Sequence, residues 1–274
     1  MFRRRDSVIQ IKTEAEIAVM RAAGLVVART LETVRAAVAP GVTTAELDAI
    51  AEDSIRGAGA VPSFKGYHGF PASICASVNE EIVHGIPGPK ILRDGDIVSI
   101  DCGAIVDGYH GDAAVTVAVG EAAPELLELI GVCEDAMWQG LAAVRAGGRL
   151  SDIGHAIETS IAARGGYGIV REYTGHGIGT EMHQEPHVPN FGRPGRGPRL
   201  QKGLALAVEP MVNLGSRHTR LLEDGWTVVT SDGKRSAHFE HTVAVTDDGP
   251  WVLTALDGGS SRLRELTAGS AALA

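Results

Sequence analysis

Residues 97–119 read IVSIDCGAIVDGYHGDAAVTVAV, and this stretch decides how the middle of the chain folds. Apolar runs at 97–100 and 113–119 predict two strands, and the Asp107-Gly108 pair between them predicts a hairpin turn. Asp101 and Asp112 would face each other across this hairpin, with Cβ atoms roughly 5 Å apart, close enough to hold one metal ion or to bracket two. The alternative is one exposed turn aspartate and one aspartate at a strand end.

Two helices are predicted before the hairpin and two after it. The first begins at Thr13, which forms a capping box with Glu16, and should run to about Ala39. Thr43 with Glu46 caps the second, Pro124 is a first-turn residue of the third, and Ser151 caps the fourth. Further strands are predicted at residues 73–78, 205–209, 226–230, 239–245 and 251–254.

The order of helices followed by strands occurs twice, which suggests an internal repeat. Gly41 aligns with Gly147 and Leu47 with Ile153, each pair 106 residues apart, and the alignment continues through the second helix without a gap. This repeat predicts two similar halves that share one sheet, with a cleft between them where a ligand would bind.

The composition is that of a soluble globular protein, with 274 residues, 44% hydrophobic side chains and a formal net charge of -9. The acidic balance argues against a protein that coats nucleic acid by bulk charge. The three cysteines, Cys75, Cys102 and Cys133, have neither zinc-knuckle nor CxxC spacing, which indicates a reducing compartment. Because the first ten residues lack the apolar core of a signal peptide, and no apolar run reaches about 18 residues, we expect a cytoplasmic protein without a membrane span.

Three segments have plainer predictions. Residues 1–12 would form an N-terminal arm that includes the basic run from Arg3 to Arg5. Residues 255–274 would form a C-terminal tail, of which 260–274 would be frayed or form a short helix. The loop at 192–199, Gly-Arg-Pro-Gly-Arg-Gly-Pro-Arg, is basic and flexible; it would either meet ribosomal RNA or, as we favour, remain solvated.

Carboxylates at the ends of apolar strands are the main functional signal. Glu209 follows the run at 205–208, and such a half-buried carboxylate needs a proton, a cation or a metal beside it. Glu240 lies within a predicted strand, so parity turns His241 to the opposite face, where solvent exposure and burial are equally expected. His176 and His183 lie in a glycine-rich loop, where a histidine taken alone is more often solvated than a ligand. Four acids and one imidazole, Asp101, Asp112, Glu209, Glu240 and His176, together favour a metal site.

Together these segments resemble the type I methionine aminopeptidases, within a wider family that includes Xaa-Pro aminopeptidases, prolidases and creatinase. The resemblance spans roughly residues 12–250 and is carried by five motifs in family order: His84-Gly85-Ile86-Pro87, Ile100-Asp101 through Gly111-Asp112, Gly175-His176-Gly177-Ile178-Gly179, Glu209-Pro210-Met211 and Glu240-His241-Thr242. It implies an α/β (α+β) fold of the pita-bread type, in which two pseudo-twofold related halves share a curved, largely antiparallel sheet covered by helices. Residues 13–254 would form this single catalytic domain, with halves at about 13–120 and 121–254.

The same resemblance implies a metal-dependent hydrolase that removes the initiator methionine from nascent polypeptides when the second residue is small. Asp101, Asp112, His176, Glu209 and Glu240 would bind two divalent metal ions, Co, Mn, Fe or Zn, with Asp112 and Glu240 bridging them. Glu209, His183 and His84 would be the catalytic residues. Glu209 would shuttle the proton, His183 would contact the scissile peptide, and His84 would contact the backbone of the second substrate residue.

Tyr67, Phe70, Cys75 and Trp226 would form the methionine pocket beside His84 and His183, as an apolar, aromatic slot suited to a thioether. Without the family context, core packing is the favoured explanation of Tyr67, Phe70 and Trp226. Phe70 and Met182 depart from the usual family pattern and leave the preference for the second residue open. We expect a monomer that makes transient contact with the ribosome and none with a membrane.

Two other functions stay open at this stage. An Xaa-Pro peptidase would use the same five ligands, but such enzymes usually carry a substantial extra N-terminal domain, whereas the first helix here begins at Thr13. A binding module of the same fold would have lost its ligands, whereas all five ligand positions are filled here. The two peptidase functions would differ in whether Met-Ala-Ser or Ala-Pro is cleaved.

Overall fold

The structure, a computed structural model, describes residues 8–271. It is built around one curved sheet of nine strands in which every pairing is antiparallel. The central path of the sheet runs β1-β4-β5-β14-β9-β7-β8, with β2 paired to β4 and β15 paired to β14. The first seven residues of the predicted N-terminal arm, with the run from Arg3 to Arg5, lie outside the described residues.

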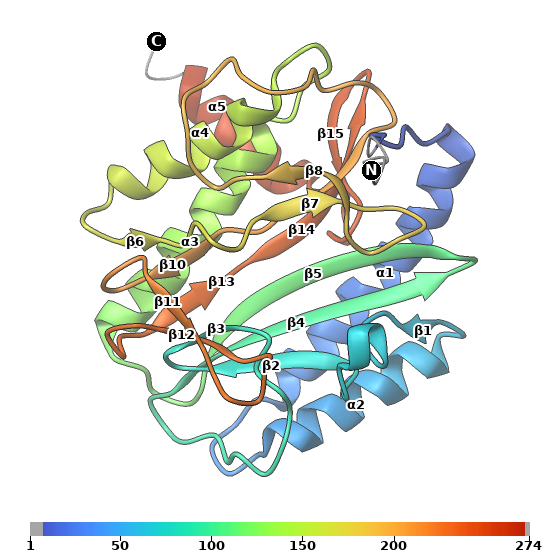
Figure 1. The fold of residues 1–274 in the computed structure, drawn as a ribbon. Coiled ribbons are helices and arrows are strands. Elements are labelled where there is room, and N and C mark those ends of the chain that lie inside the picture. Colours follow the sequence, from blue (N-terminus) through green and yellow to red (C-terminus); the bar gives the residue numbers. More distant parts are fainter. Residues whose placement is uncertain (1–7, 272–274) are drawn as a thin grey trace, which may run out of the picture.

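The long hairpin of β4 and β5 crosses the middle of the molecule, and β14 lies next to it (Figure 1). The nine strands of this sheet are β1 (Val61–Pro62), β2 (Ile74–Val78), β4 (Ile97–Val106), β5 (Tyr109–Ala118), β7 (Gly175–Gly177), β8 (Gln184–Val188), β9 (Ala205–Val208), β14 (Glu240–Thr246) and β15 (Gly249–Val252). Two small sheets flank it: β13 (Ser236–His238), β10 (Met211–Asn213) and β6 (Gly168–Ile169) form one, and β11 (Thr219–Leu221), β12 (Val228–Thr230) and β3 (Glu81–Val83) form the other.

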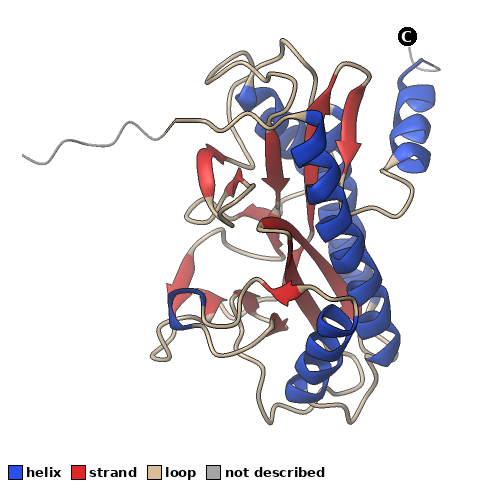
Figure 2. Cartoon of the chain, turned by 90° about the vertical axis from the view of Figure 1, so that its right-hand side faces the viewer, coloured by secondary structure: helices blue, strands red, loops and turns tan. Residues whose placement is uncertain are grey.

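The helices gather on one side of the main sheet and leave the other side to loops and short strands (Figure 2). They are α1 (Glu14–Ala37), α2 (Thr44–Gly57), α3 (Pro124–Ala142), α4 (Leu150–Ala162) and α5 (Ser260–Ala271), with one short 3-10 turn at η1 (Tyr67–Gly69). No helix within the described residues is long and apolar enough to cross a bilayer.

Most of the predicted helix ends are confirmed, and one cap is wrong. Thr13 and Thr43 both form complete capping boxes with a glutamate three residues on, and Pro124 occupies the first turn of α3. The cap of α4 is Arg149, whose backbone N–H donates to the carboxylate of Asp152, and Ser151 lies inside the helix. The Ser151 hydroxyl instead accepts from the backbone N–H of Arg196, so it fixes the loop at 192–199 rather than the helix end.

The predicted repeat is confirmed in the backbone where α2 and α4 begin. The N–H of Gly41 donates to the carbonyl of Leu92, and 106 residues later the N–H of Gly147 donates to the carbonyl of Leu200. The return bonds match as well, because Leu92 donates to Val42 and Leu200 donates to Gly148. Both glycines have positive φ, 95° and 85°, so the same tight turn precedes the same helix in each half.

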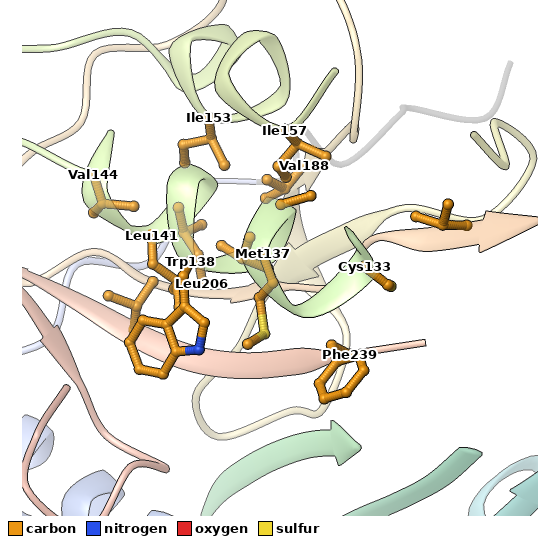
Figure 3. Packing of buried hydrophobic residues seen from close by; sticks show 14 of the residues in the cluster. Cys133, Met137, Trp138, Leu141, Val144, Ile153, Ile157, Val188, Leu206 and Phe239 are labelled. Atoms are coloured by element: carbon orange, nitrogen blue, oxygen red, sulfur yellow. The ribbon is translucent and has the colours of Figure 1, made fainter. Parts of the chain in front are cut away.

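Each half has its own apolar core between its helices and the sheet. In the first half, Val27 and Leu31 of α1 and Leu47 of α2 pack with Ile74 and Ile100 of the sheet. In the second half, side chains of α3 and α4 interdigitate with Val188, Leu206 and Phe239, and Figure 3 shows Met137, Trp138, Leu141, Ile153 and Ile157 in this layer. Burial of each large aliphatic side chain contributes roughly 1.5–3 kcal/mol to the free energy of folding. Each half is therefore stabilised by its own core and not by the site between the halves.

Residues 260–271 of the predicted C-terminal tail form the helix α5, and residues 272–274 lie outside the described residues. Leu263 and Leu266 of this helix pack against the core of the second half, and Arg262 forms an ion pair with Asp135 of α3. These contacts tie α5 to the outer face of α3.

Candidate metal centre

All eleven residues predicted for the site line one cavity of about 300 Å³. The first half supplies Tyr67, Phe70, Cys75, His84, Asp101 and Asp112, and the second half supplies His176, His183, Glu209, Trp226 and Glu240. The cavity therefore lies between the two halves, as the repeat predicts.

The pairing of Asp101 and Asp112 differs from the prediction. The turn at Asp107-Gly108 is confirmed, with φ values of 47° and 82°, and Val106 pairs with Tyr109. This register places Asp101 opposite Ala114 and Asp112 opposite Gly103, so the two aspartates are diagonal neighbours on one face rather than direct partners. Their carboxyl groups still interact, and both line the cavity.

The backbone of Asp112 is held by the side chain of Thr242. The N–H of Asp112 donates to Thr242 Oγ1 at 3.0 Å, and the same hydroxyl donates to the carbonyl of Asp112 at 2.8 Å. Next to this clamp, Glu240 pairs with Ala114 and His241 with Ala113, which joins β14 of the second half to β5 of the first. The seam between the halves therefore carries Asp112 on one strand and Glu240 on the other.

His176 lies on a strand, β7, and not in the loop that its glycines suggested. A Cβ on Gly175 would overlap the carbonyl oxygen of Ala207, and one on Gly177 would overlap that of Glu185, so neighbouring strands approach here more closely than side chains would allow. His176 is buried, and its Nδ1 lies 2.9 Å from the carbonyl oxygen of Gly177. This contact leaves Nε2 facing Glu209 Oε1 at 3.3 Å.

Glu209 follows β9 directly, as its place after the apolar run predicts. Its backbone carbonyl accepts a hydrogen bond from the side-chain amide of Asn190 at 3.0 Å. The two carboxylate oxygens lie near different imidazoles, with His176 Nε2 at 3.3 Å from Oε1 and His238 Nε2 at 3.8 Å from Oε2.

Burial opposes charge on every titratable group at the bottom of the cavity. Desolvation raises the pKa of Asp101 to about 7, and desolvation together with neighbouring carboxylates holds the pKa values of Asp112, Glu209 and Glu240 well above their usual range. Desolvation also lowers the pKa of His176 to about 3, so the contact between His176 and Glu209 is not an ion pair at neutral pH. Four carboxylates so close together are stable in their ionised form only beside positive charge.

The donor set fits divalent metal ions. Asp101 Oδ1, Asp112 Oδ1 and Glu240 Oε1 are buried and have no hydrogen-bond partner among residues 8–271. Ligand atoms of Asp112, His176 and Glu240 lie within 4.8 Å of one another, as do those of Glu209, His238 and Glu240. Carboxylate oxygens with imidazole nitrogen suit transition-metal ions and zinc.

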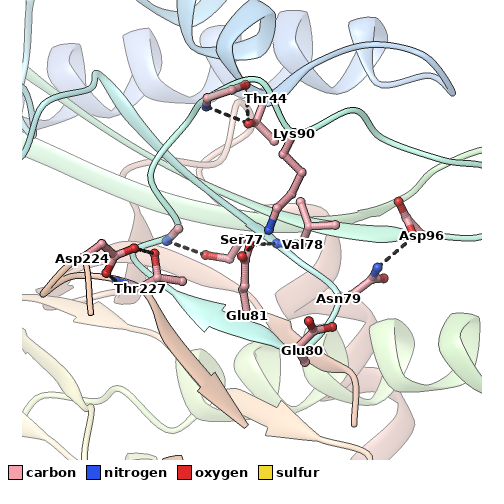
Figure 4. Close-up of polar contacts among 12 residues, drawn as sticks. Thr44, Ser77, Val78, Asn79, Glu80, Glu81, Lys90, Asp96, Asp224 and Thr227 are labelled. Carbon is pink, nitrogen blue, oxygen red and sulfur yellow. Dashed lines mark hydrogen bonds and ion pairs between the residues drawn. The ribbon is translucent and has the colours of Figure 1, made fainter. Parts of the chain in front are cut away.

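His84 is presented to the cavity by a fixed turn between β3 and the loop that follows. It has a positive φ of 61°, and the N–H of the next residue, Gly85, donates to Ser77 Oγ at 3.0 Å. Figure 4 shows this part of the chain, where the carboxylate of Glu81 accepts from the backbone N–H of Val78 and pairs with Lys90. These bonds hold the backbone around His84, and the His84 ring lies edge-on to the rings of Tyr173 and Trp226.

His183 is exposed at the mouth of the cavity and is oriented by Tyr67. The Tyr67 hydroxyl lies 2.8 Å from His183 Nδ1, and the His183 ring lies 4.4 Å from that of His176, centroid to centroid. With Nδ1 engaged, Nε2 is the nitrogen of His183 that can meet a substrate.

Part of the cavity wall is apolar and aromatic. Phe70 and Trp226 meet edge to face with centroids 5.1 Å apart, and Cys75 and Met182 are buried in the same cluster. Asp224 fixes the turn that presents Trp226 by accepting from its backbone N–H at 2.9 Å. Phe70 and Trp226 therefore both pack in an apolar cluster and line the cavity.

Some lining residues were not predicted from the sequence as part of the site: Phe64, Val83, Tyr173, Thr174, Met211 and His238. His238 carried a usable signal, because it lies two residues before Glu240 and strand parity turns both to one face. Phe64 and Tyr173 reach the cavity from irregular segments, where no periodicity predicts their direction.

His241 points away from the site, as parity predicts, and it is partly buried. Its Nδ1 lies 2.8 Å from Thr254 Oγ1, and its ring meets that of Trp138 edge to face at 5.1 Å. Burial lowers the pKa of His241 to about 4.

Comparison with known proteins agrees with this fold. The model of metallopeptidase family M24 matches residues 18–247, and the chain belongs to this family. A methionine aminopeptidase of Clostridium acetobutylicum is 53% identical over 247 residues, which cover 90% of this chain and 98% of that protein. Methionine aminopeptidase 1 of Bacillus subtilis is 52% identical over 243 residues, 89% of this chain and 98% of that protein.

A solved structure shares the whole architecture. The crystal structure of methionine aminopeptidase from Rickettsia prowazekii is 45% identical, with a TM-score of 0.88, and the match covers 90% of this chain and 100% of that chain. The resemblance to type I methionine aminopeptidases and the predicted pita-bread fold are confirmed by these matches.

Proposed function

We propose that this protein is a metal-dependent aminopeptidase that hydrolyses the peptide bond after an N-terminal methionine, with a preference for a small second residue. The observation that carries the proposal is one cavity with two unlike walls. Buried carboxyls and imidazoles line one part of it, and an apolar, aromatic cluster lines another. The relatives named methionine aminopeptidase at about half identity support the same reaction.

Asp101, Asp112, His176, Glu209 and Glu240 would hold two divalent ions. The three unpartnered buried oxygens on Asp101, Asp112 and Glu240 support this assignment. When bound, the ions would supply the positive charge that makes water a nucleophile near neutral pH and that polarises the scissile carbonyl. Co, Mn, Fe or Zn would suit this oxygen-rich set.

Glu209 is suited to accept and return a proton, because its carboxyl lies at the cavity floor with one oxygen near the imidazole of His176 and the other near that of His238. His183 would donate a hydrogen bond from Nε2 to the oxygen of the scissile peptide, with its ring held by Tyr67. His84, fixed through Gly85 and Ser77, would contact the backbone of the second substrate residue. Glu209 would thus transfer the proton, His183 would stabilise the developing charge, and His84 would position the substrate.

The apolar wall suits a methionine side chain. A thioether is flexible and polarisable and packs well against ring edges, and the pair of Phe70 and Trp226 offers such edges beside the buried Met182. Tyr67 and Cys75 would complete the pocket. The free α-amine of the substrate would lie toward the carboxylates on the floor, which suits its positive charge.

The substrates would be nascent polypeptides, and the protein would act as a cytoplasmic monomer that contacts the ribosome transiently. The three cysteines are buried and unpaired, which suits a reducing compartment. The loop at 192–199 exposes Arg193, Arg196 and Arg199 and is tied to α4 through Gly195 and Asp152. Co-sedimentation with ribosomes that weakens with added salt and with Arg193→Ala and Arg196→Ala would support this contact, and salt-independent or absent binding would refute it.

A peptide assay with a metal titration tests the proposed reaction. Metal-free protein should release methionine from Met-Ala-Ser when Co, Mn, Fe or Zn is added, and metal analysis should find stoichiometric ions. The Glu209→Gln variant should lose roughly 100-fold or more in kcat, because a general acid–base group contributes about that much. Glu172→Gln, an exposed acid at the rim of the neighbouring groove, is the matched control.

The outcomes separate the alternatives. Full turnover by Glu209→Gln would refute the assignment of Glu209, and faster cleavage of Ala-Pro than of Met-Ala-Ser would indicate an Xaa-Pro peptidase. Absence of bound metal together with absence of hydrolysis would indicate a binding module.

A further inference from the structure

His238 is an imidazole at the cavity floor that the five-residue ligand set does not include. It ends β13, its side chain is 2% exposed, and it lines the same cavity as Glu209 and Glu240. The sequence places it two residues before Glu240, on the same face.

The backbone of His238 is fixed from two sides, which sets the direction of its ring. Its N–H donates to Thr116 Oγ1 at 2.8 Å, and the same hydroxyl donates to its carbonyl at 2.8 Å. On the other side, His238 pairs with Met211 of β10. The ring is therefore presented to the floor of the cavity by a rigid support and not by a loop.

The Nε2 atom of His238 is buried and has no hydrogen-bond partner in the part of the chain that the structure describes. Its neighbours are carboxylates: Glu209 Oε2 lies 3.8 Å away, and ligand atoms of Glu209, His238 and Glu240 all lie within 4.8 Å of one another. The 3.8 Å separation is too long for a hydrogen bond. Two atoms that are each about 2.1 Å from one ion can lie up to about 4.2 Å apart, so the separation fits a shared ion.

The arrangement around Glu209 is two-sided. His176 Nε2 approaches Oε1 at 3.3 Å, and His238 Nε2 approaches Oε2 at 3.8 Å, so each oxygen of one carboxylate has an imidazole beside it. A buried imidazole nitrogen without any partner destabilises the folded protein, and a metal bond removes that cost.

We propose that His238 is a sixth protein ligand of the metal centre, which binds through Nε2 to the ion held by Glu209 and Glu240; this inference rests on the metal site of the proposed function. A second imidazole makes the site softer than four carboxylates and one histidine. It therefore favours Co, Fe and Zn over Mn and Mg, which prefer oxygen.

Cobalt titration of His238→Gln tests this ligand directly. Glutamine has a similar length and keeps an N–H donor, but it lacks the imidazole nitrogen that binds metal. We expect Co(II) affinity, measured by calorimetry, to fall about 10-fold or more, the visible absorption of bound Co(II) to change, and Mn(II) affinity to fall much less. His241→Gln is the matched control, because it removes a partly buried imidazole one residue from Glu240 on the opposite face and should leave the Co(II) spectrum unchanged.

Unchanged Co(II) affinity and spectrum in His238→Gln would overturn the proposal and leave His238 at most a hydrogen-bond donor to Glu209. A measurement on the unaltered protein guards against a variant that fails to fold. Proton NMR of the Co(II)-loaded protein should contain two exchangeable, hyperfine-shifted ring N–H signals, one each from His176 and His238, and a single signal would also overturn the proposal.

Failure of this inference is distinguishable from failure of the proposed function. Methionine release from Met-Ala-Ser with only one imidazole signal would remove His238 from the ligand set and leave the peptidase assignment intact. Two imidazole signals without methionine release would keep His238 in the ligand set and refute the peptidase assignment.

Discussion

Replacement of Thr242 by valine should weaken the joint between the two halves of the molecule. Valine has the shape of threonine, so the change removes the hydroxyl and leaves packing nearly as it was. In the unaltered protein that hydroxyl satisfies both the N–H and the carbonyl of Asp112, and Thr242 is fully buried. The variant therefore leaves two buried backbone groups without partners.

The magnitude follows from those two groups. Each buried unsatisfied group costs about 1–3 kcal/mol, so the free energy of unfolding should fall by roughly 2–6 kcal/mol. At about 2–4 °C per kcal/mol for a domain of this size, a loss near the middle of that range lowers Tm by roughly 8–16 °C. Because Asp112 would shift with its backbone, metal affinity should fall about 10–100-fold as well.

Urea unfolding of chelator-treated protein and calorimetric metal titration measure the two effects. Thr242→Ser keeps the hydroxyl and should retain most of the stability and the metal affinity. Thr246→Val, on the same strand, removes a hydroxyl that bonds to Gly249 in a turn that water can reach, and it should cost less than about 1 kcal/mol. A loss below about 1 kcal/mol in Thr242→Val, equal to that in Thr246→Val, would refute the clamp.

Three further predictions concern other parts of the structure. Gly24→Ala places a Cβ against the carbonyl oxygen of Leu253 and should cost about 3 kcal/mol in thermal unfolding, whereas Gly131→Ala, an open position in α3, should stabilise by up to about 1 kcal/mol; equal effects would contradict the close contact of α1. His241 has a pKa of about 4 in the folded protein, whereas in the unfolded chain its ring protonates below about pH 6.5. The free energy of unfolding should therefore fall as the pH falls, by about 2 kcal/mol between pH 7.5 and pH 5. His241→Gln should remove that part of the pH dependence, and identical pH profiles in urea titrations would refute it. Ser77→Ala leaves the N–H of Gly85 unpaired beside His84 and should raise KM for Met-Ala-Ser more than it lowers kcat, while unaltered kinetics would remove the positioning role of Ser77.

Two of the candidate ligands are conspicuous in the sequence, because each is an acid that lies directly after or at the start of an apolar strand. Glu209 after β9 and Glu240 at the start of β14 are of this kind, and burial of the run before or after the acid is what makes the acid conspicuous. The helix caps Thr13 and Thr43 were equally readable, because a capping box is a local pattern that needs no tertiary contact.

What the sequence did not reveal depends on contacts between distant segments. The turn sets the register of the hairpin, since Val106 pairs with Tyr109, and in this register Asp101 and Asp112 are not directly opposite each other. Both side chains still lie on the same face of the sheet, and this is what brings them into one cavity. The glycines on either side of His176 predicted a loop, whereas His176 lies on a strand. Glycine is needed there because the carbonyl groups of Ala207 and Glu185 on neighbouring strands come too close for a side chain. Ser151 is the right residue type for a cap, yet the carboxylate of Asp152 binds the N–H of Arg149 one turn earlier and sets the start of α4 there.

The chain passes from its first half to its second at residues 119–123, between β5 and α3. Asp101 and Asp112 precede this crossing, whereas His176, Glu209 and Glu240 follow it. A chain cut at Gly120 would give two pieces, each with its own apolar core but neither with a full set of donors. Metal capture by a mixture of the two pieces would therefore measure their reassembly along the strand pair of β5 and β14, and not the folding of either piece alone.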